Sequence, residues 1–208
     1  MNPIYLAIAL MALTVTASNI LVQILLGSYL TWGALTYPVA FLITDLVNRY
    51  HGAAAARKVV LFGFVTGIIC SVIGTQIEGE FGPLVTLRVA LGSATGFLVA
   101  QLSDVAVFDR LRHRNWWVPP LVSTIIGATL DTILFFSIAF SATLDLFGTS
   151  ESAAAAWASE ISPLLGFGPD LPLWVSLAMA DWSVKIALAL LALAPFRLIL
   201  NRLGSSRV

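Results

Sequence analysis

The sequence predicts an all-α membrane protein with six transmembrane helices, and three observations support this fold class. Of the 208 residues, 59% are hydrophobic and 11% are charged, and the mean hydropathy is +0.93. A soluble domain carries about 25% charged residues. The apolar residues gather in six stretches long enough to cross a bilayer, which requires about 20 residues each. Lysine and arginine residues fall in alternate joints between these stretches, as in a chain that crosses a membrane repeatedly.

The six predicted spans form one domain over residues 1–208, because no loop is long enough for a second domain. They cover residues 4–26, 32–49, 58–76, 84–108, 117–141 and 171–194. The first span lacks the basic start and the short apolar core of a cleavable signal peptide, so we expect it to be retained. The longest loop, 142–170, contains SAAAAWASE, which is compatible with a short interfacial helix anchored by Trp157 or with an irregular loop.

The placement of basic residues predicts the orientation of the chain. Nine of the eleven lysine and arginine residues lie in the second joint, the fourth joint and the C-terminal tail. The other joints contain no basic residue, and the third and fifth joints carry acidic residues instead. Loops rich in lysine and arginine stay in the cytoplasm. Both termini are therefore predicted to be cytoplasmic.

Several functional classes lack their sequence signals. The formal net charge is zero, which gives no indication of nucleic-acid binding. Cys70 is the only cysteine, and His51 and His113 both lie in predicted cytoplasmic loops, so neither a disulfide framework nor a metal site is expected. The chain has no phosphate-binding loop, zinc-protease motif or nucleophile elbow. We therefore predict no cofactor and no enzymatic activity.

Charged residues inside the predicted spans are the main functional signal. Each charge costs about 2.5–3.5 kcal/mol at the centre of a span, so such residues face the protein interior, form pairs or line a cavity. Counting along the spans places Asp131, Asp181 and Lys185 near the midplane of the membrane. The four carboxylates and two bases within spans are Asp45, Asp104, Asp131, Asp181, Arg88 and Lys185.

Two interpretations remain open for the midplane residues. Asp181 and Lys185 are four residues apart and share a helix face, so they form either a structural ion pair or a ligand or proton site. Trp182 beside them is compatible with packing or with a base-stacking surface. Asp131 has no base on its own helix turn, which suggests a function, although pairing with Lys185 or protonation would also explain it. We expect these polar groups to converge on a hollow inside the bundle.

Other polar positions also have two explanations. Thr16, Asn19 and Gln23 repeat at helical spacing and form either an interhelical hydrogen-bonding stripe or a surface for a donor-rich solute. Asp45, near the cytoplasmic end of the second span, forms either a local anchor with Arg49, which we expect, or part of a substrate site. Arg88, near the outer end of the fourth span, either extends toward the outer headgroups or binds substrate.

The fourth span is expected to lie at the centre of the bundle. Gly92, Gly96 and Ala100 form a small-residue stripe that allows close helix approach. Gln101 and Asp104 lie on roughly the opposite face of the same span. A helix that needs polar partners on two faces is expected to be surrounded by protein.

Five strings of residues resemble one known family. They are TASNILVQ (16–23), TYPVAFLITDLVNRYHGAAAAR (36–57), LVAQLSDVAVFDRLR (98–112), VSTIIGATLDTILFFSIAF (122–140) and DWSVK (181–185). These strings resemble the queuosine precursor transporter family, of the vitamin-uptake-transporter type, over most of the chain. Loop 142–170 shows no family pattern.

The resemblance implies uptake of the 7-deazaguanines preQ0 and preQ1 across the bacterial inner membrane. It also implies six helices similar to those of the substrate-binding subunits of energy-coupling-factor vitamin importers. The recurrent polar positions of the family map onto Asn19, Gln23, Asp45, Arg88, Gln101, Asp104, Asp131 and Lys185.

Three functional hypotheses follow. The first is a transporter of a small deazapurine that acts alone in the lipid membrane, since carboxylates suit the N1–H and amino donors of a guanine edge and an amide or base suits its O6 acceptor. The second is a binding subunit that requires ATPase partners. The third is a membrane enzyme or scaffold, which the spread of polar residues across the membrane depth disfavours. A homodimer is compatible with each hypothesis.

Overall fold

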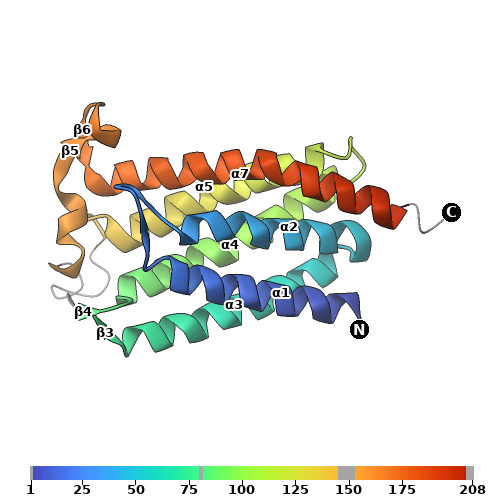
Figure 1. Ribbon diagram of the computed structural model, residues 1–208, viewed down its shortest axis with the longest axis horizontal. Coiled ribbons are helices and arrows are strands. Elements are labelled where there is room, and N and C mark those ends of the chain that lie inside the picture. Colours follow the sequence, from blue (N-terminus) through green and yellow to red (C-terminus); the bar gives the residue numbers. More distant parts are fainter. Residues whose placement is uncertain (1, 80–81, 145–152, 205–208) are drawn as a thin grey trace.

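Six long helices, arranged side by side, make up most of the chain in the computed structural model, which describes residues 2–79, 82–144 and 153–204. They run along one axis (Figure 1). Their bounds are α1 Pro3–Leu21, α2 Gly33–His51, α3 Ala53–Thr75, α4 Leu87–Leu111, α5 Val118–Phe140 and α7 Leu173–Gly204. The predicted all-α class is therefore confirmed.

Three two-stranded hairpins lie at one end of the bundle (Figure 1). They join β1 (Leu25–Leu26) to β2 (Leu30–Thr31), β3 (Glu78–Gly79) to β4 (Gly82–Pro83), and β5 (Ile161–Pro163) to β6 (Asp170–Pro172). The short helices η1 (Ala156–Ser159) and η2 (Leu164–Gly166) complete this end. Because the hairpins pair their own backbone groups, the chain reverses direction there with few unpaired backbone groups.

Successive helices run in opposite directions, and both chain ends lie at the end of the bundle opposite the hairpins (Figure 1). Arg49 near the end of α2, Arg57 at the start of α3 and Arg110 near the end of α4 therefore belong to the end that holds the termini. Glu78 and Asp170 lie in the hairpins at the other end. The structure thus separates the basic and acidic joints to opposite ends of the bundle.

Five of the six helices, namely α1, α3, α4, α5 and α7, are long and apolar enough to cross a membrane. The exception, α2, has 19 residues but carries Asp45, Asn48 and Arg49. Ten of its residues are buried, and it contacts α1, α3, α4 and α7. A helix enclosed by other helices needs less apolar surface, which explains why α2 has the length of a span without its hydropathy.

Three predicted boundaries are wrong by several residues. The first helix ends at Leu21 rather than residue 26, because the chain turns into the β1–β2 hairpin. The third begins at Ala53, immediately after Gly52, whose φ of 84° suits glycine at a helix junction. The last helix continues through Pro195 to Gly204, ten residues beyond the predicted end. Hydropathy locates apolar residues, whereas these ends are set by turns and by polar helical extensions.

The small-residue stripe of the fourth span is confirmed as a packing surface. A methyl group on Gly92 would lie 3.1 Å from the carbonyl oxygen of Phe135, and one on Gly96 would lie 2.8 Å from Asp131 Oδ1. Ala100 is fully buried. These residues let α4 approach α5 closely, and polar residues on both faces of α4 are buried. The central position predicted for the fourth span belongs to α2 instead, because α2 contacts each of the other five long helices, whereas Leu91 and Val99 of α4 are partly exposed.

Arg88 does not extend toward the headgroups as predicted. Its side chain is only 1% exposed. Its Nε donates to the carbonyl oxygen of Ile138 at 3.1 Å, and its Nη2 donates to that of Ser141 at 2.7 Å. A helix leaves its last carbonyls without partners, so the guanidinium group is used to cap the end of α5 and join it to α4.

The long outer loop contains short ordered pieces rather than one helix. Residues 156–159 form η1, and the half-exposed Trp157 packs edge-on against Phe140 with ring centroids 5.6 Å apart. The β5–β6 hairpin follows. Residues 153–154 are helical and a turn at residue 155 leads into η1, so the described part of SAAAAWASE combines the two alternatives, short helical turns and irregular chain. The part of the loop at 145–152 lies outside the described residues.

Replacing Arg88 with alanine should destabilise the α4–α5 pair. The carbonyl groups of Ile138 and Ser141 would lose charged donors in a region with little water, and hydrogen bonds to charged groups are worth about 1.5–3 kcal/mol each. We expect a lower midpoint in thermal unfolding of the detergent-purified protein. Arg57→Ala removes an exposed arginine and is the matched control. Equal midpoints for the two variants would contradict the capping role.

Candidate functional site

A buried lysine is held between two carboxylates in the middle of the bundle. Lys185 Nζ lies 2.6 Å from Asp131 Oδ2 and 2.6 Å from Asp181 Oδ2. Asp131 comes from α5, whereas Asp181 and Lys185 lie one turn apart on α7. Lys185 and Asp131 are each 5% exposed. The structure therefore pairs Asp131 with Lys185, which is one of the two interpretations that its sequence position left open.

Hydroxyl groups complete this network. Tyr37 from α2 donates to Asp131 Oδ1 at 2.7 Å, and Thr132 donates to Asp181 Oδ2 at 3.1 Å. Lys185 Nζ also lies 4.5 Å from the centre of the Tyr37 ring, a distance that suits a cation–π contact. We call Tyr37, Asp131, Asp181 and Lys185 the lysine layer. Two carboxylates and one ammonium leave it with one formal negative charge.

Trp182 supports the layer from outside rather than forming part of it. Its indole N–H donates to Thr129 Oγ1 at 3.0 Å, and that hydroxyl donates to the carbonyl oxygen of Ile125 at 2.8 Å. These bonds join α7 to α5. The contacts favour packing over stacking for this side chain.

A second buried polar group lies nearer the end of the bundle that holds the termini. Asp45 of α2 lies against Asp104 of α4, and Gln101 lies one turn before Asp104. All three side chains are at least 97% buried. Thr44 on α2 donates to Gln101 Oε1 at 2.8 Å. We call Asp45, Gln101 and Asp104 the carboxyl layer.

The carboxyl layer is poorly satisfied by the residues around it. Within the described chain, four of its buried atoms have no hydrogen-bond partner, namely Asp45 Oδ1, Asp104 Oδ1, Asp104 Oδ2 and Gln101 Nε2. The Ser123 and Thr124 hydroxyl groups adjoin Asp45, the Ser123 hydroxyl also adjoins Asp104, and the two carboxyl groups adjoin each other. Ser123 has a further, long contact of 3.4 Å to the carbonyl oxygen of Pro120. The lysine layer is satisfied by ion pairs and hydroxyl groups, so the two layers differ in kind.

The predicted anchor between Asp45 and Arg49 is wrong. Asp45 turns inward to Asp104, while Arg49 Nη1 donates to the carbonyl oxygen of Arg112 at 2.8 Å. Arg112 Nη2 in turn donates to Asn48 O at 2.8 Å and to Asn48 Oδ1 at 2.7 Å. Two arginines therefore join the ends of α2 and α4 below the carboxyl layer.

The two layers are separated by an aromatic side chain. Tyr37 and Asp45 are eight residues apart on α2, which is about 12 Å of helix at 1.5 Å per residue. Phe41 lies midway, is 2% exposed and contacts Tyr37 edge-on with ring centroids 5.4 Å apart. A methyl group on Gly127 of α5 would lie 2.7 Å from the Phe41 ring, so the ring fits into a gap that only glycine provides.

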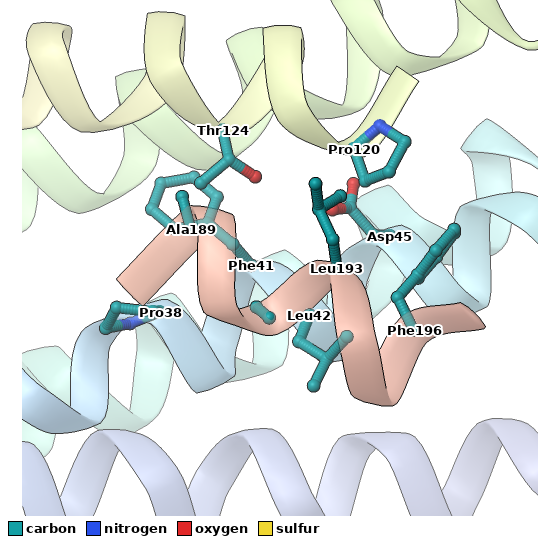
Figure 2. A pocket seen from close by; sticks show the side chains of 10 residues that line it. Pro38, Phe41, Leu42, Asp45, Pro120, Thr124, Ala189, Leu193 and Phe196 are labelled. Atoms are coloured by element: carbon teal, nitrogen blue, oxygen red, sulfur yellow. The ribbon is translucent and has the colours of Figure 1, made fainter. Parts of the chain in front are cut away.

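A small cavity adjoins the carboxyl layer. Its volume is about 10 Å³, and its lining comes from α2, α5 and α7. Figure 2 shows the Asp45 carboxyl group and the Thr124 hydroxyl group turned toward this space, with Phe41 beside them and Phe196 at the far side. A volume of this size suits one water molecule. Beside the carboxyl layer, the expected hollow is therefore a cavity too small to hold a nucleobase.

Asn19 and Gln23, two of the predicted site residues, lie apart from both layers. Asn19 donates to the carbonyl oxygen of Val15 on its own helix at 2.9 Å. Gln23 follows the end of α1, is exposed and lies 3.5 Å from the carbonyl oxygen of Leu84. The predicted stripe through Thr16, Asn19 and Gln23 is therefore wrong beyond Leu21, because the helix ends before Gln23.

Sequence reasoning missed Tyr37 and Thr44, although a signal was available. Tyr37, Phe41, Thr44 and Asn48 recur at positions i, i+4, i+7 and i+11, which places them on one face of α2. The structure turns this face inward, where Tyr37 meets Asp131, Thr44 meets Gln101, and the Asn48 amide donates to the carbonyl oxygen of Val105 at 3.0 Å.

Comparison with known proteins finds a family and relatives that match this chain. Residues 31–200 match the model of the family described as "Putative vitamin uptake transporter". The chain is 31% identical over 207 residues to the "Queuosine precursor transporter" of Escherichia coli K12, covering 92% of this chain and 83% of that protein. It is 40% identical over 128 residues to a "Probable queuosine precursor transporter" of Haemophilus influenzae, covering 56% and 54% of the two chains.

The chain belongs to this vitamin uptake transporter family. The resemblance found in its sequence strings is confirmed, and the family indicates a transporter rather than an enzyme. A Bacillus subtilis protein of the same printed description as the Haemophilus one is 33% identical over 136 residues, covering 56% of this chain and 58% of that protein. No solved structure matches the chain. The similarity to energy-coupling-factor subunits therefore stays a prediction.

The region matched by the vitamin uptake transporter family includes both layers but not Asn19 and Gln23. Among the residues that the structure describes, no group of three histidine, cysteine, aspartate or glutamate side chains could hold a metal ion. The side chains of the two layers themselves offer ion-pair and hydrogen-bonding contacts.

Lys185→Met should destabilise the protein strongly, because it leaves Asp131 and Asp181 buried without their base. Breaking a buried ion pair on one side costs about 3–5 kcal/mol. The triple variant with Asp131→Asn and Asp181→Asn removes the uncompensated charge and should recover much of the loss. Thermal unfolding in one detergent measures both. A Lys185→Met variant as stable as the parent chain would show that the network carries little electrostatic energy.

Proposed function

We propose that this chain is a transporter that acts alone to take up the 7-deazaguanine precursors of queuosine, preQ0 and preQ1, through the bacterial inner membrane. One observation supports this most: a charged network with an excess negative charge lies buried at mid-length of an apolar bundle in a chain of this family. Intramembrane ionisable residues of this kind mark substrate or ion pathways.

We propose six membrane crossings, with α2 as the sixth. Its 19 residues span about 28 Å at 1.5 Å per residue, close to the thickness of the hydrocarbon core. The alternating helix directions support this count (Figure 1). The basic residues at the end that holds the termini support a cytoplasmic location for both termini. The whole chain then forms one membrane domain.

The two layers suit different parts of such a substrate. The lysine layer has one excess negative charge, which suits the ammonium group of preQ1, while Lys185 can serve an acceptor atom. The carboxyl layer offers acceptors for N–H donors of a deazaguanine ring. We therefore assign substrate binding to Asp45, Gln101, Asp104, Asp131, Asp181 and Lys185. Arg88, Asn19, Gln23 and Trp182 support helix packing or loop structure in the described conformation.

Transport requires the closed bundle to open at either end in turn. In the described conformation, the contacts of Arg49, Arg112 and Asn48 join α2 to α4 at the proposed cytoplasmic end. Arg88 joins α4 to α5 at the opposite end. A substrate with different affinities for the two open forms would shift the populations between them.

Uptake by the purified protein tests whether it acts alone. Proteoliposomes containing only this chain should accumulate radiolabelled preQ0 or preQ1 above the level of empty vesicles. Competition by unlabelled adenine should be weak. Uptake equal to that of empty vesicles would reject transport without partners. Restoration of uptake by an added ATPase would instead support the binding-subunit hypothesis.

If a proton gradient drives uptake, Asp131→Asn should abolish accumulation of the substrate. The variant loses the carboxylate that binds both Tyr37 and Lys185. We expect at least a tenfold lower initial uptake rate in proteoliposomes, with binding of ligand retained in part. Asp170→Asn makes the same chemical change on an exposed hairpin residue and serves as the control. Accumulation by Asp131→Asn at the control level would remove Asp131 from the mechanism.

A further inference from the structure

The unpartnered atoms of the carboxyl layer form a recognisable pattern. Three buried oxygens of Asp45 and Asp104 have no donor with hydrogen-bond geometry, although the two carboxyl groups adjoin each other, and Gln101 presents one amide nitrogen without an acceptor. An unsatisfied buried polar group costs about 1–3 kcal/mol, and the surrounding lipid supplies no water to replace a partner. Four such atoms in one place indicate a surface adapted to bind something with complementary donors and acceptors.

The geometry of α4 places these atoms side by side. Gln101 and Asp104 are three residues apart, so their side chains lie on neighbouring turns of one helix face. The Thr44 hydroxyl lies 2.8 Å from Gln101 Oε1 and 2.9 Å from the carbonyl oxygen of Ala40. The Ala40 carbonyl already accepts from the helix backbone, so we assign the single hydroxyl proton to Gln101 Oε1, which leaves the Gln101 NH₂ group as the free end. Asp45 approaches from α2, next to Thr44 in the chain. The water-sized cavity lined by Asp45 and Thr124 adjoins this group (Figure 2).

A guanine-type edge has the reverse pattern. It carries two neighbouring donors, N1–H and the 2-amino group, and one acceptor, O6. A carboxylate can accept both donors in parallel bonds, and an amide NH₂ can donate to O6. A hypoxanthine-type edge lacks the 2-amino donor, and an adenine-type edge has a donor where guanine has O6. The pattern therefore selects the guanine edge among purine-like rings.

We propose that the carboxyl layer is the specificity site that reads the guanine edge of the substrate. Asp104 accepts hydrogen bonds from N1–H and the 2-amino group, Gln101 Nε2 donates to O6, and Asp45 supplies a second acceptor for the 2-amino group. The assignment rests on the proposed function, because the transported class of compound comes from it. Under this assignment, the lysine layer contacts the substituent at position 7 of the substrate, and the carboxyl layer contacts its guanine edge.

Opening of this site involves Phe41. The ring separates the two layers, and the adjoining cavity of about 10 Å³ is too small for a bicyclic ring. Since Phe41 and Asp45 lie one turn apart on α2, a shift of α2 away from α5 enlarges the space beside both. The ligand then replaces the Phe41 contacts while its edge satisfies the four unpartnered atoms.

The test is a binding comparison between two ligands that differ by one group. The ligands are 7-cyano-7-deazaguanine and the same compound without its 2-amino group, titrated calorimetrically into the purified full chain in detergent. The parent chain should prefer the aminated ligand by about tenfold or more, the discrimination expected of a bidentate base contact. Asp104→Asn replaces one acceptor with a donor, so this preference should fall to about onefold to threefold.

Two further variants separate recognition from folding and charge. Asp170→Asn makes the same chemical change at an exposed hairpin residue outside both layers and should keep the parent preference for the 2-amino group. Gln101→Glu places an acceptor against O6 and should weaken binding of both ligands at least tenfold. It also serves as the second test should Asp104→Asn not fold, as judged by gel filtration and thermal unfolding.

The outcomes separate the edge assignment from the transporter proposal. A parent chain that binds both ligands equally, or an Asp104→Asn variant that keeps the tenfold preference, overturns the edge assignment and leaves the transporter proposal standing. A Gln101→Glu variant that binds both ligands as tightly as the parent chain also overturns the edge assignment alone. A parent chain that binds neither 7-deazaguanine ligand rejects the proposed substrate class, and the edge assignment with it.

Discussion

The placement of Lys185 between Asp131 and Asp181 is the constraint on which the arrangement of the bundle depends. A charge buried among apolar helices is tolerated only with close partners, and the two 2.6 Å contacts, together with the Tyr37 hydroxyl, tie α2, α5 and α7 together. The packing of α4 follows from the same requirement. A methyl group at Gly96 would lie 2.8 Å from Asp131 Oδ1, so the glycine leaves room for the carboxylate while allowing α4 to lie directly against α5.

The carboxyl layer obeys a different rule. Its acids have no base beside them, and its amide keeps an unused donor. A protein that needed only stability would place apolar side chains there, since replacing both partners of a buried polar pair can be nearly neutral. Retaining unsatisfied atoms lowers the stability of the closed form relative to a form in which a ligand or water reaches them. The two layers thus combine a network that stabilises the closed bundle with a group of atoms that favours its opening.

Much of the fold follows from the sequence, because hydropathy and the positions of lysine and arginine residues can be assessed along the chain without knowing how the helices pack. The number of long helices and their alternating directions needed no tertiary information. The pairing of Asp45 with Asp104 rather than Arg49 did, since it depends on how α2 is rotated about its axis against α4. Tyr37 and Gln23 show the same limit. Tyr37 acquires its role from Asp131, 94 residues away in the sequence. Gln23 loses its predicted role because α1 ends at Leu21, two residues before it.

Helix α2 connects the two layers and can couple them under the proposed function. It contributes Tyr37 to the lysine layer and Asp45 to the carboxyl layer, with Phe41 between them and Arg112 bound to its last turn. A rigid helix that moves to admit a ring beside Asp45 also displaces the Tyr37 hydroxyl from Asp131, which weakens the network that holds the bundle closed. Binding at one layer would then change the energy of the other through a single shared element. A coupling of this kind needs no long chain of contacts, only two positions about 12 Å apart on one helix.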